Sequence, residues 1–298
     1  MRPPFPDILF PVLAAACYAL GVIAVKYASK SKTISGVSLL AMNNLLSGAV
    51  FIPQIFFAPD LPEFSIIWQP LLAGAFCAAG NLATFICAER GEVSLMTPIM
   101  GVKILFVLIF SNMMLQTRLP FSIMISGAIC CAAVFIMGAS KSKLNRQKFR
   151  FTVFLALSAC ASYAACDVLM QKYAPNFSTR AMLALTTVAM PVSVIPLIPK
   201  LIGELKKSNP ETIAFGSFSS VLLVGESYLM FISITGAVGA AMSNILFNTR
   251  GIIAIALIFA FGTKSMKIRE LDRHLAMRRA FGAAMILLSI FAALYCRQ

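Results

Sequence analysis

Long apolar segments separated by short polar links constrain this chain more than any other feature. Ten such segments can be counted, and each is close to the roughly 20 residues that a helix needs to cross a lipid bilayer. Backbone polar groups find no water in lipid, so a segment of this kind must bond internally as a helix. The sequence therefore predicts an all-α membrane protein with ten transmembrane helices, at residues 8–28, 36–57, 66–88, 94–115, 120–139, 150–172, 181–202, 213–235, 238–262 and 277–296.

The composition excludes a soluble protein and makes the lipid bilayer the main partner. Apolar residues make up 59% of the chain and charged residues 12%, about half of the roughly 25% that is usual in soluble domains. The net charge of +14 could suggest nucleic acid, but the basic links lack the interleaved aromatic residues of such sites. No nucleic-acid partner is expected. The eight cysteines fall in or beside apolar segments, with no disulfide or metal-binding pattern.

The distribution of basic residues predicts the orientation in the membrane. With ten helices, 18 of the 25 Lys and Arg residues fall in links on the face opposite the termini, and five on the face of the termini. Basic links remain on the cytoplasmic side. We therefore expect an integral protein of a bacterial inner membrane with both termini in the periplasm. No cleavable signal peptide is recognised, so the segment from Ile8 should stay as the first helix.

An internal repeat divides the chain into two halves. Residues 15–28 read AACYALGVIAVKYA and residues 161–174 read ASYAACDVLMQKYA, and weaker matches follow in the same order along the chain. The alternative is that apolar helices simply look alike. Five helices per repeat is an odd number, so the second copy would be inverted, as in many secondary transporters. The predicted parts are a first five-helix repeat at 1–140, a basic cytoplasmic linker at 141–149 and a second repeat at 150–298.

Four ionisable residues lie deep inside predicted helices, where charge is costly and usually functional. Lys103 and Arg250 are 147 residues apart, so the repeat places them in nearly equivalent positions. Glu226 lies midway along segment 213–235 and Asp167 lies in segment 150–172, both in the second half. One interpretation is a central cavity whose two cations attract an anionic group, with an acid as counter-charge or carrier of a coupling proton. The other is an internal ion pair that fixes the packing, such as Glu226 with Arg250 or Lys103.

Uncharged polar residues extend this candidate substrate site. Amides can offer hydrogen bonds in a cavity, although they also join helices to one another. Two tyrosines lie too deep for the aromatic belt at the membrane interface, a position that suits Trp68. The uncharged candidates are Asn43, Asn81, Asn244, Asn248, Tyr18 and Tyr163.

The chain resembles the drug/metabolite transporter superfamily, EamA-type branch. The resemblance is carried by the two five-helix halves, by the short links Gly91-Glu92-Val93 and Gly236-Ala237-Val238, and by Gly127 and Gly282 in the fifth helices. It departs from the family where many halves end the fourth helix with Gly-Glu, since residues 115–118 read LQTR and residues 261–264 read FGTK. The resemblance implies export of metabolites, with a substrate that varies widely among members.

The predicted function is a secondary transporter, not an enzyme. It would move a small anionic or zwitterionic, amino-acid-like metabolite across the inner membrane by alternating access, as an exporter. No Walker, CxxC, HExxH or GxSxG motif is present, so no cofactor, metal or catalytic residue is expected. A membrane-embedded lipid-modifying enzyme and a structural or sensory subunit are the alternatives. The pattern specifies neither the substrate nor the oligomeric state.

Overall fold

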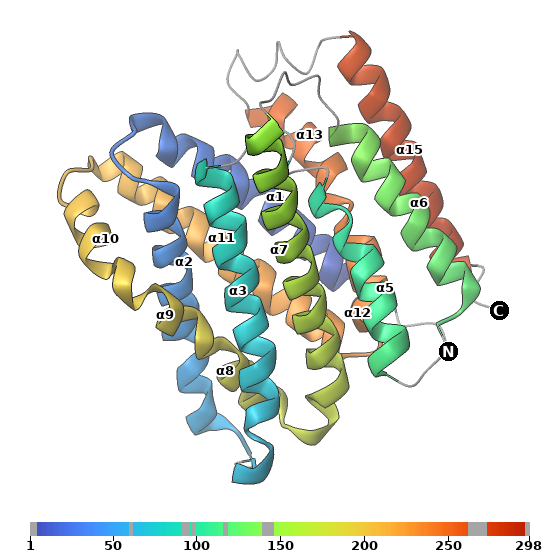
Figure 1. Ribbon diagram of the computed structural model, residues 1–298, viewed down its shortest axis with the longest axis horizontal. Helices are drawn as coiled ribbons and strands as arrows, with labels where there is room; N and C mark the ends of the chain where they lie inside the picture. Colours follow the sequence, from blue (N-terminus) through green and yellow to red (C-terminus); the bar gives the residue numbers. More distant parts are fainter. Residues whose placement is uncertain are drawn as a thin grey trace.

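The computed structural model describes residues 5–59, 62–90, 96, 99–115, 119–138, 146–261 and 273–295, and every regular element in this part of the chain is helical (Figure 1). The α-helices are α1 (Phe5–Ala28), α2 (Gly36–Phe51), α3 (Trp68–Arg90), α5 (Lys103–Met114), α6 (Phe121–Gly138), α7 (Arg146–Tyr173), α8 (Thr179–Thr187), α9 (Ala189–Val194), α10 (Ile198–Leu205), α11 (Pro210–Thr235), α12 (Gly239–Phe247), α13 (Arg250–Phe261) and α15 (Arg273–Tyr295). Short 3₁₀ segments are η1 (Ser29–Ser31), η2 (Ile52–Phe57), η3 (Phe64–Ile66), η4 (Ala174–Asn176) and η5 (Ile195–Leu197).

Membrane-spanning helices confirm the prediction of an all-helical integral membrane protein. Within the described residues, six helical segments are long and apolar enough to cross a bilayer, and three apolar helices are shorter. The six are Asp7–Ser31, Gly36–Phe57, Phe64–Cys87, Arg146–Asn176, Thr179–Leu205 and Pro210–Thr235, and the shorter ones are Lys103–Met114, Phe121–Ile136 and Ala280–Leu294. The count of ten transmembrane helices stays a prediction.

Several predicted helices are interrupted or shifted, and proline explains most of the interruptions. Pro53 lacks the N–H that would continue α2, and the chain tightens there into η2. Segment 181–202 divides into α8, α9, η5 and α10, with prolines at positions 191, 196 and 199. Helix α7 begins at Arg146, inside the predicted linker, because its first five residues are exposed and need no apolar partner.

Helices from the two halves of the chain pack against each other in pairs. Helix α1 lies along α11, α3 lies along α7, and α6 lies along α15 (Figure 1). Helix α12 is buried along its whole length and contacts α1, α5, α7 and α11. The main apolar core, which includes Ile104, Val168, Ile234 and Ile245, surrounds this central helix.

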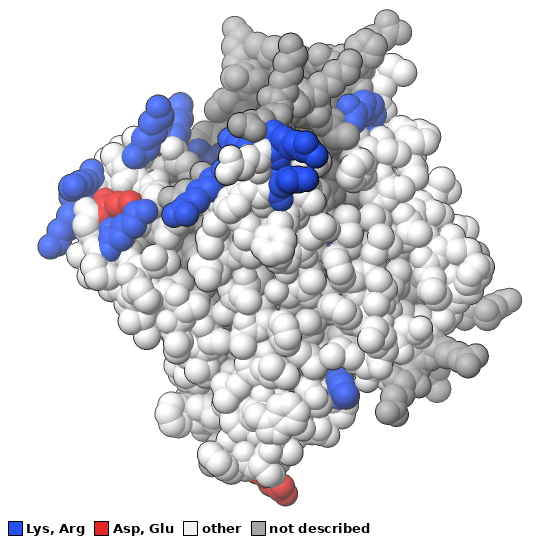
Figure 2. All heavy atoms as spheres, viewed as in Figure 1, with Lys and Arg blue, Asp and Glu red and all other residues white. Residues whose placement is uncertain are grey.

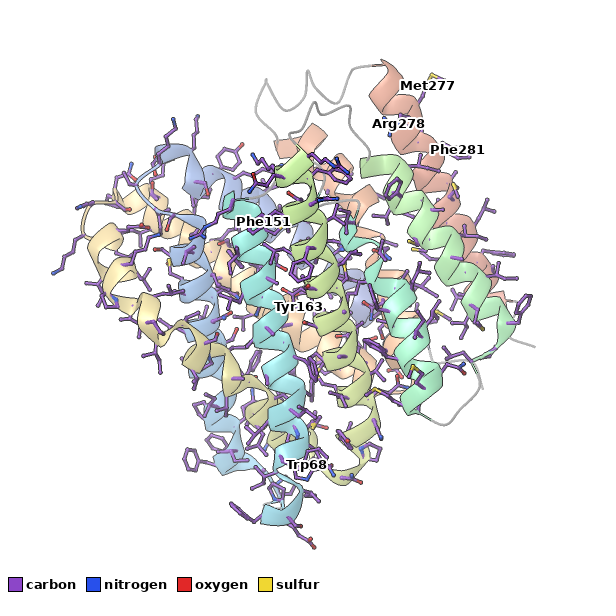
Figure 3. All side chains as sticks on the ribbon, in the orientation of Figure 1. Trp68, Phe151, Tyr163, Met277, Arg278 and Phe281 are labelled. Atoms are coloured by element: carbon purple, nitrogen blue, oxygen red, sulfur yellow. The ribbon has the colours of Figure 1, made fainter. Side chains whose placement is uncertain are left out.

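The two ends of the bundle differ in charge. Basic side chains gather over the end where α1 finishes and α7 begins (Figure 2). Trp68 lies at the other end, with its ring 5.8 Å from that of Tyr173, and Tyr163 lies at an intermediate depth (Figure 3). Aromatic pairs at such a position suit the membrane interface. The link 91–93, residues 141–145 of the predicted linker and the basic residues at 264–272 lie outside the described residues.

Candidate functional site: a charged cluster at mid-depth

An ion pair inside the bundle joins the two halves of the chain. The Lys103 Nζ atom on α5 lies 2.7 Å from Asp167 Oδ2 on α7, and the two side chains are 19% and 9% exposed. The same Asp167 oxygen accepts a hydrogen bond of 2.7 Å from the Asn244 amide on α12. Asn244 also donates to the Ala240 carbonyl one turn earlier, which fixes the direction of its amide. Asp167 is therefore held by a cation and an amide from two other helices.

One face of α7 contacts Lys103 and the residues just before α5. Cys160, Tyr163 and Asp167 are three and four residues apart, so they project from the same side of the helix. The Cys160 thiol donates to the Ile99 carbonyl at 3.4 Å, just before α5. The Lys103 ammonium lies 5.6 Å from the centre of the Tyr163 ring, within the range of a cation–π interaction. This face therefore gives Lys103 both a carboxylate and an aromatic ring.

Tyr163 is held in place by α3. Its hydroxyl donates to Asn81 Oδ1 at 2.7 Å and accepts a hydrogen bond of 3.3 Å from the Thr84 hydroxyl. Gly80 allows the ring to approach, because a Cβ at that position would lie 2.9 Å from two of the ring carbons. These contacts orient the ring beside Lys103.

Arg250 occupies a different environment from Lys103. Its guanidinium carbon lies 4.8 Å from the centre of the Tyr18 ring on α1 and 4.6 Å from that of Phe247. The two rings meet edge to face, with their centres 5.6 Å apart. Among the described residues, no Asp or Glu oxygen lies within 4.0 Å of this guanidinium. Cation–π contact leaves the N–H groups at the edge of the guanidinium free to meet an anion.

Both intramembrane cations begin a helix that follows a break. Lys103 is the first residue of α5, after a turn at Gly101 and Val102, and Arg250 is the first residue of α13, after a turn at Asn248 and Thr249. Backbone hydrogen bonds of the 3₁₀ type cross the second turn, from Asn248 to Ile245 and from Thr249 to Leu246. These backbone groups are therefore bonded within the turn, and the side chains beside it are the groups that can bind a solute. Broken helices at membrane depth occur where they are buried in protein or line a binding site.

Glu226 completes a set that we call the central charged cluster: Lys103, Asp167, Asn244, Arg250 and Glu226. It lies on α11, half-buried, within the electrostatic range of both cations and of Asp167. Its carboxylate accepts one hydrogen bond of 3.3 Å, from the hydroxyl of the adjacent Ser227. Within the described part of the chain, no Lys or Arg nitrogen lies within 4.0 Å of it. The cluster thus combines one close ion pair with one separated pair of opposite charges.

Three of the four sequence-predicted amides lie outside this cluster: Asn43, Asn81 and Asn248. Asn248 is buried and its amide lies 3.2 Å from the Cys130 sulfur on α6. Asn43 donates weakly to Asn44 at 3.4 Å, and Asn44 donates to the Met190 carbonyl on α9. The Asn248 contact joins α6 to the turn after α12, whereas the described contact of Asn43 stays within α2, and its Oδ1 atom is buried with no hydrogen-bond partner among the described residues. Tyr18, Tyr163 and Asn81, in contrast, contact the cations directly or orient a ring that does.

Three residues with a part in this arrangement were not predicted from the sequence. Phe247 lies three residues before Arg250, a spacing that could have indicated its ring as a partner. Thr84 also stands three residues after Asn81, on the same face of α3. Gln171 accepts from the Ala240 backbone N–H at 2.8 Å and so satisfies the start of α12, beside Gly239 with its φ of 76°. No local pattern marks Gln171, because its partner is distant in sequence.

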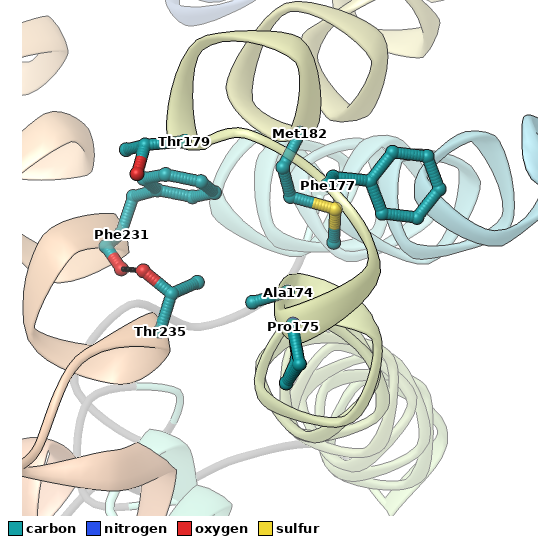
Figure 4. Close-up of a pocket in the computed structure, with 7 residues that line it drawn as sticks. All are labelled: Ala174, Pro175, Phe177, Thr179, Met182, Phe231 and Thr235. Carbon is teal, nitrogen blue, oxygen red and sulfur yellow. Dashed lines mark hydrogen bonds between the residues drawn. The ribbon is translucent and has the colours of Figure 1, made fainter. Parts of the chain in front are cut away.

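A separate pocket of about 130 Å³ opens near the ends of α7 and α11 (Figure 4). It is lined by Ala174, Pro175, Phe177, Thr179, Met182, Phe231 and Thr235. The Thr235 hydroxyl donates to the Phe231 carbonyl at 2.8 Å. Ala174 follows Asp167 by seven positions, or roughly 10 Å along a helix that rises 1.5 Å per residue. The pocket thus lies about two helical turns from the central charged cluster, toward the end that carries Trp68.

The fold and its buried charges define a helical integral membrane protein with a polar centre. Residues 6–139 match the family model of the EamA-like transporter family. This match confirms the resemblance to the EamA-type branch of the drug/metabolite transporter superfamily, and it indicates a membrane transporter of that type.

Comparison with solved structures supports the same fold over nearly the whole chain. Matches are found to 27 chains. One is a crystal structure described only as that of a protein, with a TM-score of 0.72 and 12% sequence identity, and the match covers 98% of this chain and 97% of the other. At this identity the likeness concerns the fold alone. No curated protein matches the sequence.

Proposed function

We propose that this protein is a secondary transporter that carries a small anionic or zwitterionic metabolite, of amino-acid type, out across the inner membrane by alternating access. The observation that carries this proposal is the environment of Arg250. Its guanidinium lies between two aromatic rings inside the bundle, without a carboxylate within ion-pair distance among the described residues. An intramembrane cation is costly unless it serves a purpose, and a solute carboxylate is a suitable partner.

The surroundings of Arg250 favour a zwitterion over a simple anion. Lys103 is already neutralised by Asp167, so it offers little attraction to a second carboxylate. Glu226 lies within the electrostatic range of Arg250 and has no close cation in the described part of the chain. A solute with a carboxylate and an ammonium group would match Arg250 and Glu226 together. In a site of low dielectric, this match of charges is worth more than in water.

An inverted repeat is the architecture that we propose for the transport cycle. The exchange of partners between the halves supports it: α1 packs with α11 and α3 packs with α7. The cations follow the same exchange, because Lys103 of the first half contacts Tyr163 of the second and Arg250 of the second contacts Tyr18 of the first. Alternating access in such folds is largely the rocking of one part against the other around a fixed site.

Contacts between the halves at both ends of the bundle could serve as gates. At the basic end, the Ser35 backbone N–H donates to Glu204 Oε2 at 2.7 Å, and the Ser208 hydroxyl donates to that of Thr33 at 3.0 Å. At the opposite end, Arg180 donates to the Phe57 carbonyl at 2.7 Å. In the proposed cycle, one set of contacts opens while the other stays closed.

The proposal is tested by the transport of labelled solutes into proteoliposomes. A thermal-shift screen of the purified protein against amino acids, phosphorylated sugars, nucleosides and quaternary amines selects the solute. Arg250→Ala should reduce uptake of that solute at least about tenfold while the melting temperature changes little, since loss of one charge-assisted hydrogen bond costs roughly 1.5–3 kcal/mol. Lys207→Ala removes an exposed cation and serves as the control, with uptake like that of the unmodified protein. Full uptake by Arg250→Ala would refute this site.

A further inference from the structure

The two carboxylates of the central charged cluster differ in how completely they are partnered. Asp167 has the Lys103 ammonium and the Asn244 amide on one oxygen, each at 2.7 Å, and its side chain is 9% exposed. Protonating this oxygen would set Lys103 free as an unpaired cation inside the membrane. Breaking a buried pair in this way is strongly unfavourable. Asp167 is thus bound into the packing of α5, α7 and α12.

Glu226 lacks such partners in the part of the chain that the structure describes. The one hydrogen bond to its carboxylate is from the neighbouring Ser227 hydroxyl, at 3.3 Å, and its side chain keeps some exposed surface. A half-buried carboxylate inside the membrane without a close cation is costly when charged, and protonation removes that cost. Glu226 can therefore change its charge without disturbing an ion pair.

The groups around Glu226 come from several helices and act in opposite directions. Helix α1 presents Cys17, α7 presents Tyr163 and Asp167, α5 presents Lys103, and α13 presents Arg250. Helices α2 and α12, which also pack on α11, contain no titratable residue. Lys103 and Arg250 attract a charged Glu226 carboxylate and Asp167 repels it, and the close Lys103–Asp167 pair offsets two of these three charges.

We infer that Glu226, rather than Asp167, is the carboxyl group that binds and releases a coupling proton in exchange for the solute. The inference rests on the proposed transport function. Loss of the proton from the Glu226 carboxyl to water on one side leaves a carboxylate that binds the ammonium group of the solute. Departure of the solute on the other side lets a proton from that side bind the same oxygen. One proton therefore moves in one direction for each solute molecule moved in the other.

Two variants separate the roles of these carboxylates. Glu226→Gln permanently resembles the protonated form. In proteoliposomes with a pH gradient, its accumulation of a mixture of labelled L-amino acids should be at least tenfold lower than that of the unmodified protein. Asp167→Asn should lower the melting temperature, yet its remaining transport should still respond to the gradient. If Asp167→Asn cannot be purified, the double variant Lys103→Met/Asp167→Leu replaces it, because it removes both charges together. A Glu226→Gln protein that responds to the gradient like the unmodified protein would overturn the inference.

Infrared difference spectroscopy supplies a readout that does not depend on transport. As the pH is lowered, the protein should gain a band from a protonated carboxyl group. That band should be missing from Glu226→Gln and present in Asp167→Asn or the double variant. Its persistence in Glu226→Gln would overturn the inference even if transport is found. Absence of any amino-acid transport by the unmodified protein, together with loss of the band in Glu226→Gln, would instead refute the proposed function and leave Glu226 as the proton-binding group.

Discussion

One oxygen of Asp167 contacts both the Lys103 ammonium and the Asn244 amide, and these two contacts connect three helices. Lys103, Asp167 and Asn244 come from α5, α7 and α12. An ion pair of this kind contributes little net stability relative to apolar residues of similar size, but removal of one partner leaves a buried charge. Replacing one member of the pair should therefore destabilise the protein more than replacing both members together.

We expect Asp167→Ala to destabilise the protein by roughly 3–5 kcal/mol, because Lys103 would remain charged without a partner. Lys103→Ala should be similarly costly. The double variant Lys103→Met/Asp167→Leu should recover most of the loss, since no charge is left unpaired. Melting temperatures of the four proteins in detergent provide the measurement. A double variant as unstable as the two single variants together would show that the pair is not the reason for the loss.

The residues of this pair could be predicted from the sequence, but the pairing could not. Charges deep in apolar segments are conspicuous, and the predicted repeat gives Lys103 and Arg250 nearly equivalent positions. Which acid meets which cation depends on the relative heights and rotations of α5, α7, α11 and α13, and these are properties of the packed bundle. The two readings of the sequence, an ion pair and a binding site, therefore apply to different cations in the structure: Lys103 is paired, and Arg250 is available for the proposed solute.

Close approach of helices depends on a few glycines. A Cβ on Gly74 of α3 would overlap the backbone carbonyl oxygen of Thr186 on α8. Backbone cannot rotate away as a long side chain can, so the helices would have to separate. Small residues at such crossings are the usual way in which membrane helices come together.

Gly74→Ala should consequently destabilise the protein by about 1–3 kcal/mol, the usual cost of adding a methyl group where there is no room. Gly203→Ala in α10 is the matched control, because a Cβ there meets no atom within 4 Å. That control should be neutral or slightly stabilising, as alanine is the better helix former. Thermal unfolding of both variants measures the difference. Equal stability of the two proteins would show that α3 and α8 do not approach as closely as described.

The existence of the helices was easier to predict than their interruptions. Each described α-helix overlaps a predicted segment, although several, such as α1, α7 and α15, extend beyond its bounds. The prolines of η2 and of α8 to α10 could have indicated those breaks, because each removes a backbone donor. The break at Asn248 and Thr249 has no proline, and the 3₁₀ turn there depends on the buried contacts of α12. It could not be inferred from local preference.

At the scale of the whole molecule, the packing links the two halves so closely that neither half forms the site alone. Lys103 and Tyr18 lie in the first half, whereas Asp167, Glu226 and Arg250 lie in the second. The family model covers residues 6–139, and the solved structure of similar fold covers 98% of the chain. The complete fold thus extends beyond the matched first half, and the charged cluster requires both halves.

The difference in charge between the two ends of the bundle predicts its orientation in the membrane. The basic end of the bundle should face the cytoplasm, since basic residues are retained there during insertion. A reporter fused after Gln298 should then lie in the periplasm, and one inserted at Asn145 in the basic linker should lie in the cytoplasm. Alkaline phosphatase, active only outside, and green fluorescent protein, fluorescent only inside, should give opposite signals at the two positions.

The paired positions also test the five helices of the second half, because an odd number of spans must separate them. The same signal at both would contradict that number, and reversed signals would contradict the orientation.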